Sequence, residues 1–143
     1  MTFNPDIEET TGQCHCGAVK FRVRLQDGLR RVARCNCSIC RMKGAVMAFA
    51  SLGSLEISEG EELLSTHQFH TMTAKHHFCS RCGIHLFHQR RIVPGLYAVN
   101  VAVLDGVSPF DFGDVPVLDG ENHPRDTGGA ELKLIGHLRF EPD

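Results

Sequence analysis

Short stretches in which apolar and polar residues alternate make up much of the chain. In residues 18–25, every second side chain from Val19 to Leu25 is apolar and those between them are basic, which is typical of a half-buried strand. Residues 96–104 are apolar on both faces and suit a central strand. Further strand candidates are residues 45–50, 63–70, 75–79, 84–88 and 132–140. With Gly-rich turns and no amphipathic helix of about 12 residues, this pattern predicts an all-β fold of short antiparallel strands.

The stretch from Leu104 to Gly129 departs from this alternation. It is rich in Asp, Gly and Pro and shows little periodicity. We therefore expect an irregular loop that wraps the sheet or borders a pocket, and its length favours a functional role or some hidden regular structure. Single helical turns are expected after Ser38 or Ser108 at most.

Length and composition narrow the class of protein. A chain of 143 residues with 42% hydrophobic and 22% charged residues predicts one globular domain, residues 1–143. The net charge of −2 argues against a general nucleic-acid binder. No apolar run reaches the ~18 residues of a membrane span. The polar, acidic start, residues 1–10, lacks the pattern of a signal peptide, so we expect a cytoplasmic protein that is not membrane-bound.

Seven cysteines fall into three tight groups, which points to metal ligands in a reducing compartment. Disulfides within the groups are disfavoured by strain and by the odd count. If each group stays whole, only the two pairs sum to the four ligands of a closed zinc site, and the triplet keeps a vacant fourth position. Zinc is the expected metal and an iron–sulfur cluster is the alternative. The groups are Cys14 and Cys16; Cys35, Cys37 and Cys40; and Cys79 and Cys82.

Each cysteine pair runs directly into a glycine. Gly17 and Gly83 permit the tight backbone of a metal-binding knuckle. Two knuckles that meet in space would clamp one zinc between two hairpins and contribute to the folding free energy.

Charge is unevenly distributed. Residues 20–43 hold eight Lys or Arg and one acidic residue, whereas residues 63–104 hold no Asp or Glu. The basic segment is either a solvated strand face or an anion-attracting rim in which Arg34 and Arg41 flank the cysteine triplet.

Three ordered motifs resemble those of the glutathione-dependent formaldehyde-activating (Gfa/CENP-V) family. They are GQCHCGAVKF at residues 12–21, CNCSICR at 35–41 and FCSRCGI at 78–84, supported by Asn100–Val101 and residues 119–124. The resemblance covers roughly residues 11–126. The long basic extension of the family's chromosome-associated branch is absent from this sequence.

The resemblance implies an Mss4-like fold, two zinc ions and a carbon–sulfur lyase that condenses glutathione with formaldehyde. It implies a structural zinc on the two cysteine pairs and a catalytic zinc on Cys35, Cys37 and Cys40. Three thiolates around one zinc weaken its acidity towards water and favour capture of a fourth thiol. That thiolate is the expected nucleophile, and Arg34 or Arg41 would bind the glutathione carboxylates.

Proton transfer to the product falls to water or a histidine. We expect His123 to line a pocket and His15 to point outward from its knuckle. The histidines of the acid-free segment are His67, His70, His76, His77, His85 and His88.

Three other interpretations stay open at this stage. In the first, the protein is a zinc-stabilised binding module or a glutathione carrier without catalysis. A pure scaffold, however, leaves the cysteine triplet unexplained. Alternatively, a histidine or another chain fills the vacant position and makes a second structural zinc. Nucleic-acid binding through residues 20–43 is the third possibility, and it predicts affinity that falls steeply with salt.

Overall fold

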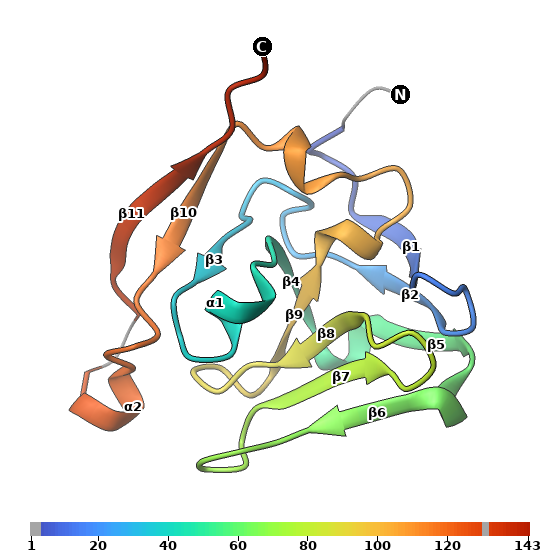
Figure 1. Cartoon of the computed structure of the whole chain (residues 1–143), viewed down its shortest axis with the longest axis horizontal. Coiled ribbons are helices and arrows are strands. Elements are labelled where there is room, and N and C mark those ends of the chain that lie inside the picture. Colours follow the sequence, from blue (N-terminus) through green and yellow to red (C-terminus); the bar gives the residue numbers. More distant parts are fainter. Residues whose placement is uncertain (1–3, 130–131) are drawn as a thin grey trace.

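The computed structural model describes residues 4–129 and 132–143, which form three β-sheets (Figure 1). The strands are β1 (Glu9–Gln13), β2 (Lys20–Arg24), β3 (Arg34–Cys35), β4 (Met47–Ser51), β5 (Leu55–Glu59), β6 (Leu64–His67), β7 (Lys75–Cys79), β8 (His85–Gln89), β9 (Leu96–Asn100), β10 (Asp114–Leu118) and β11 (Leu134–Arg139). The helices are α1 (Cys40–Lys43) and α2 (Pro124–Thr127), with 3₁₀ turns at Leu52–Ser54, Glu61–Leu63, Val101–Val103 and Pro109–Asp111. The all-β prediction is confirmed. Among the described residues, no helix is long and apolar enough to cross a membrane.

The three sheets differ in size and in strand direction. One has the order β1-β2-β5 and the largest has the order β4-β9-β8-β7-β6, and both are antiparallel throughout. The third has the order β11-β10-β3, where β10 runs antiparallel to β11 but parallel to β3. Figure 1 shows α1 between this third sheet and the five-stranded sheet. That position sets the cysteine-bearing end of β3 at the junction of two sheets.

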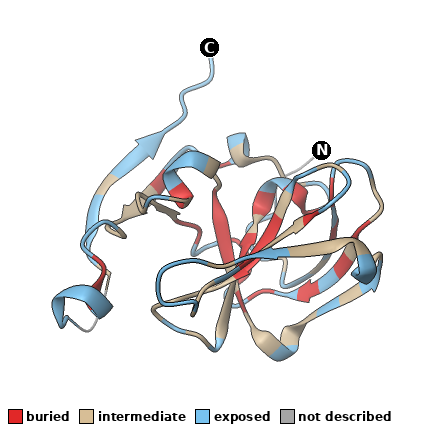
Figure 2. Cartoon of the chain, turned by 60° about the horizontal axis from the view of Figure 1, so that its bottom comes forward, coloured by how far each residue is buried: buried red, intermediate tan, exposed pale blue. Residues whose placement is uncertain are grey.

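The core lies where β2 packs against the five-stranded sheet (Figure 2). The alternation predicted for residues 18–25 is confirmed, because Val19, Phe21, Val23 and Leu25 are all buried. Phe21 meets Phe87 of β8 edge to face, with ring centroids 5.6 Å apart. This contact joins two sheets through the largest buried side chains of the core.

Two predicted segments differ from the structure. The strand expected over residues 96–104 ends at Asn100, because the Asn100 side chain accepts a hydrogen bond from Ala102 N and starts a 3₁₀ turn. That turn buries Val101 and Val103, so the apolar run serves a strand and a turn in succession. The irregular loop expected from Leu104 to Gly129 contains β10 and α2, because β10 gains ladder hydrogen bonds from both β3 and β11.

The strand predicted near the C-terminus forms as β11, but its apolar side chains are not covered. Leu134, Ile135 and Leu138 are 49–56% exposed. Figure 2 shows this ribbon projecting from the buried centre of the molecule.

Candidate metal centres and the adjoining cavity

The four-cysteine group brings together residues from two hairpins. All four Sγ atoms lie within 4.8 Å of one another, with Cys14 and Cys16 3.6 Å apart and Cys16 and Cys79 3.8 Å apart. Four sulfurs that each lie ~2.3 Å from a tetrahedral zinc are ~3.8 Å apart, so this donor set fits zinc. The members are Cys14, Cys16, Cys79 and Cys82.

Matching backbone turns present these sulfurs. Gly17 N donates to Cys14 O over 3.0 Å, and Gly83 N donates to Cys79 O over 2.7 Å. The φ angles of Gly17 and Gly83 are +77° and +78°, in the left-handed region that glycine adopts without strain. The expected pair of glycine-dependent knuckles is therefore present, and His15 between its two cysteines is exposed as predicted.

The three-cysteine group comes from one short segment. Cys35 ends β3, Cys37 lies in the following turn and Cys40 begins α1. Their Sγ atoms lie within 4.8 Å of one another, which is close enough to share one ion. Three soft thiolate donors on a single segment fit zinc and leave one side of a tetrahedral shell to another ligand.

A loop that follows β10 covers this group. Leu118 of β10 is in register with Cys35, and Asn36 Oδ1 accepts hydrogen bonds from Gly120 N over 2.7 Å and Glu121 N over 3.0 Å. A Cβ at Gly120 would lie 2.7 Å from Cys37 Cβ and would also clash with Cys35 Sγ. Glycine is therefore required where the loop passes over the sulfurs. No local pattern in the sequence indicates the Asn36 contact, since its partners lie 84 and 85 positions away.

A cavity of about 450 Å³ opens beside the three cysteines, a volume typical of small-molecule sites. The predicted residues Arg34, Arg41 and His123 all line it. The Leu104–Gly129 segment therefore borders a pocket as expected. None of the four-cysteine group is among the lining residues.

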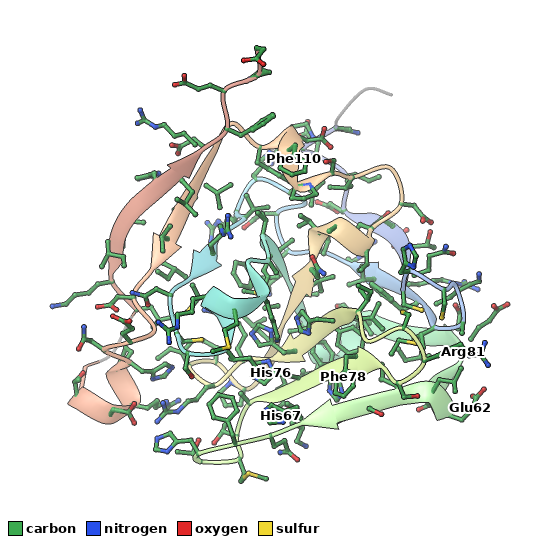
Figure 3. The ribbon with its side chains drawn as sticks, in the orientation of Figure 1. Glu62, His67, His76, Phe78, Arg81 and Phe110 are labelled. Atoms are coloured by element: carbon green, nitrogen blue, oxygen red, sulfur yellow. The ribbon has the colours of Figure 1, made fainter. Side chains whose placement is uncertain are left out.

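A basic cluster beside the site joins the buried His76 and His88 to the half-buried Lys43 and His85. Lys43 Nζ lies 2.7 Å from His76 Nδ1 and 3.4 Å from His85 Nε2. The His76 and His88 rings stack with centroids 4.7 Å apart. His76 and His88 line the cavity, whereas His85 and Lys43 do not. Figure 3 shows His76 below α1. The sequence did not single out Lys43, which looks like one more charge of the basic segment.

Burial lowers the pKa of every member of this cluster. Burial and then the nearby Lys43 lower the pKa of His76 to about 4 and that of His85 to about 3. The pKa of His88 is also well below its ordinary value, mainly through burial. Burial lowers the pKa of Lys43 to about 8. The imidazoles are therefore neutral near pH 7 and can accept or donate hydrogen bonds.

The remaining predicted histidines separate into two sets. His70 lines the cavity, while His67 and His77 do not. His77 Nδ1 lies 2.8 Å from Thr66 Oγ1 on the neighbouring strand. The basic segment divides in the same way, because Arg22 and Arg24 are exposed on β2 whereas Arg34 and Arg41 reach the cavity.

Comparison with known proteins identifies the family of this chain. The sequence profile described as glutathione-dependent formaldehyde-activating enzyme matches residues 9–112. The chain belongs to this family. The match spans all three cysteine groups and ends before residues 119–124.

Two relatives extend the comparison. A Halomonas elongata protein, provisionally named as a glutathione-dependent formaldehyde-activating enzyme, is 39% identical over 80 residues, or 50% of each chain. The chain thus spans about half the length of this curated relative. A crystal structure of a Rhodobacter sphaeroides protein matches with a TM-score of 0.73 and 51% identity, over 75% of this chain and 98% of that one.

Proposed function

We propose that this member of the family captures glutathione at the three-cysteine group and adds its sulfur to formaldehyde or a related small electrophile. By class this is a carbon–sulfur lyase, working as a single zinc domain in the cytoplasm, where thiols stay reduced. One observation carries the proposal. The three-cysteine group borders a cavity of about 450 Å³, while the four-cysteine group lies away from it.

Two zinc ions have distinct places in this proposal. Cys14, Cys16, Cys79 and Cys82 would hold a structural ion, and Cys35, Cys37 and Cys40 would hold a catalytic one. When bound, the catalytic zinc supplies positive charge that stabilises a substrate thiol as the nucleophilic thiolate.

The chemical step is an addition that conserves protons. The glutathione sulfur loses its proton and forms a bond to the aldehyde carbon, while the C=O π electrons move to oxygen as an alkoxide. The alkoxide then takes up one proton to give S-hydroxymethylglutathione. Holding both reactants in one cavity supplies much of the acceleration, since it removes the entropic cost of an encounter in solution.

We propose that His76 passes on that proton: the alkoxide takes the proton of Nε2 while Nδ1 takes one from the Lys43 ammonium, which regains it from the solvent that received the thiol proton. His76 lines the cavity, and its Nδ1 lies 2.7 Å from Lys43 Nζ. The contact with Lys43 orients the ring and leaves Nε2 for exchange with the reactants. His88 stacks on the same ring and holds it in place.

Zinc content and reaction rate together test the proposal. We expect two zinc ions per chain, one of which responds to glutathione, and S-hydroxymethylglutathione formation faster than the uncatalysed reaction by exchange NMR. The Cys37→Ser variant should lose both the response and the acceleration. Glutathione binding without acceleration would instead identify a carrier. One tightly held zinc without any thiol effect would identify a zinc-stabilised binding module.

A further inference from the structure

We infer that Arg90 binds a carboxylate of the thiol substrate, so that the cavity selects anionic thiols over neutral ones. This inference rests on the proposed capture of a thiol at the three-cysteine group. It assigns a role to a residue that lies outside the three cysteine motifs.

Four arginines line the cavity. Three of them differ from Arg90 in being paired with a carboxylate, exposed to solvent or packed against the end of α1. Arg91 is paired with Asp126, its Nη1 lying 3.0 Å from Asp126 Oδ2. Arg41 is exposed to solvent. Arg34 lies against the end of α1, where a Cβ on Gly44 would come within 3.1 Å of its Nη2.

Arg90 is held in a defined position without an acidic partner. It follows β8, and its backbone N donates to Leu96 O over 2.9 Å. Its guanidinium carbon lies 4.5 Å from the centroid of the Phe49 ring, and both side chains line the cavity. Within residues 4–129 and 132–143, its guanidinium forms no ion pair and no hydrogen bond with a carboxylate. Stacking on an aromatic ring leaves the planar edge of the guanidinium available to a ligand.

The surroundings make this cation a strong anion receptor. Burial lowers the pKa of Arg90, yet an arginine keeps its charge in proteins. The strand pair that carries it contains no Asp or Glu, since residues 63–104 have none. A charge in a partly apolar cavity is screened less than one in water, so a ligand carboxylate binds it more tightly there than at the rim.

The chemistry of the ligand follows from the shared cavity. Arg90 and the three cysteines line the same space, so one small molecule with a thiol and a carboxylate can reach both. Glutathione carries two carboxylates and fits this requirement. A neutral thiol would offer the partly buried guanidinium no carboxylate to accept its hydrogen bonds, which disfavours its binding.

A ligand–residue cycle tests the inference by calorimetry. Glutathione and glutathione diethyl ester, which lacks both free carboxylates, are each titrated into wild type, Arg90→Met and Arg22→Met. Arg22 is an exposed arginine on β2 and serves as the matched control. We expect wild type and R22M to prefer the free acid by about 10- to 100-fold, the range for a hydrogen bond to a charged group. R90M should reduce this preference to less than about threefold, and Arg90→Lys should restore part of it.

Each other outcome has a separate meaning. A preference that persists in R90M would overturn the inference. Equal weakening of acid and ester would show that Arg90 only balances the thiolate charge of Cys35 and Cys40, which also overturns it. If wild type binds neither ligand, the proposed function itself fails. Zinc content and circular dichroism of R90M report whether the variant has kept its fold.

Discussion

The four-cysteine and three-cysteine groups use the same ligand atom but are assembled from the chain in opposite ways. Cys14 and Cys79, from two separate hairpins, are 1% and 0% exposed and belong to the hydrophobic core. Cys35, Cys37 and Cys40 come from one short segment and line a cavity. We therefore expect the set that joins distant segments to stabilise the fold and the set within one segment to leave room for a substrate. The following predictions test this division.

The largest effect is expected from breaking the four-cysteine group. Cys79→Ser removes a buried ligand that links the two hairpins, and structural zinc in small zinc peptides contributes ~10–16 kcal/mol. That is comparable to the whole ~5–15 kcal/mol stability of ordinary domains. We expect C79S to lose the dispersed amide signals of a folded protein in NMR spectra. A folded C79S with two bound zinc ions would contradict the assigned structural role.

The equivalent change in the other group should leave the fold intact. Cys37→Ser removes one ligand from a set that lies within a single segment. We expect zinc content to fall by about one ion per chain while the β-sheet spectrum stays unchanged, because the proposed structural zinc is held by the four-cysteine group. If C37S unfolds as C79S does, the two groups share the structural role and the division is wrong.

A smaller effect is expected from adding a methyl group to the loop after β10 that covers the three cysteines. Gly120→Ala places a methyl group 2.7 Å from Cys37 Cβ, which forces the loop away from the sulfurs. Overpacking of this kind costs ~1–3 kcal/mol, and urea unfolding should show it together with weaker glutathione binding. Gly53→Ala is the matched control, because nothing lies within 4 Å of a Cβ at that position. Equal losses in both variants would argue against a specific contact.

The smallest effect is expected from acidification, which lowers stability through the basic cluster beside the cavity. The pKa of His76 is lowered to about 4 by burial, so between pH 6.5 and 4 the unfolded chain binds a proton that the folded chain excludes. The stability contributed by neutral His76 is thus complete above about pH 6.5 and is lost as pH falls, by at most ~1.4 kcal/mol per pH unit.

Urea unfolding at two pH values measures this loss. Wild type should lose more stability between pH 7 and pH 5.5 than His76→Gln, which does not titrate. Protonation of the metal-binding thiolates acts on both proteins alike, so their difference isolates the histidine. Parallel losses would show that His76 does not exclude its proton in the folded state.

Local patterns in the sequence sufficed for much of the fold. The alternation around Phe21 predicted β2, and the turn between Cys79 and Cys82 predicted the β7–β8 hairpin. Both depend on neighbours in sequence, since side chains alternate across a strand and knuckles need a nearby glycine. Cysteine spacing likewise predicted which sulfurs the structure brings together.

Contacts between distant segments escaped the same reasoning. β10 contains Pro116, which argues against a strand in sequence terms, and its stability comes from pairing with β3 and β11 on either side. Lys43 meets His76 across 33 positions, so neither residue alone indicates a basic cluster. Nothing in the sequence distinguishes Arg90 from a surface arginine, because its contact with the Phe49 ring is evident only in the structure.

The parallel pairing of β3 with β10 also bears on the order in which the molecule assembles. Asn36 and Asp119 are 83 positions apart, and contacts of such separation form slowly because a long loop must close first. The cysteine triplet lies within one short segment and needs no such closure to gather its sulfurs. We therefore expect metal to bind to the triplet early and the loop after β10 to pack over it last. Pulse-labelling hydrogen exchange during refolding would then show late protection at Gly120 and Glu121.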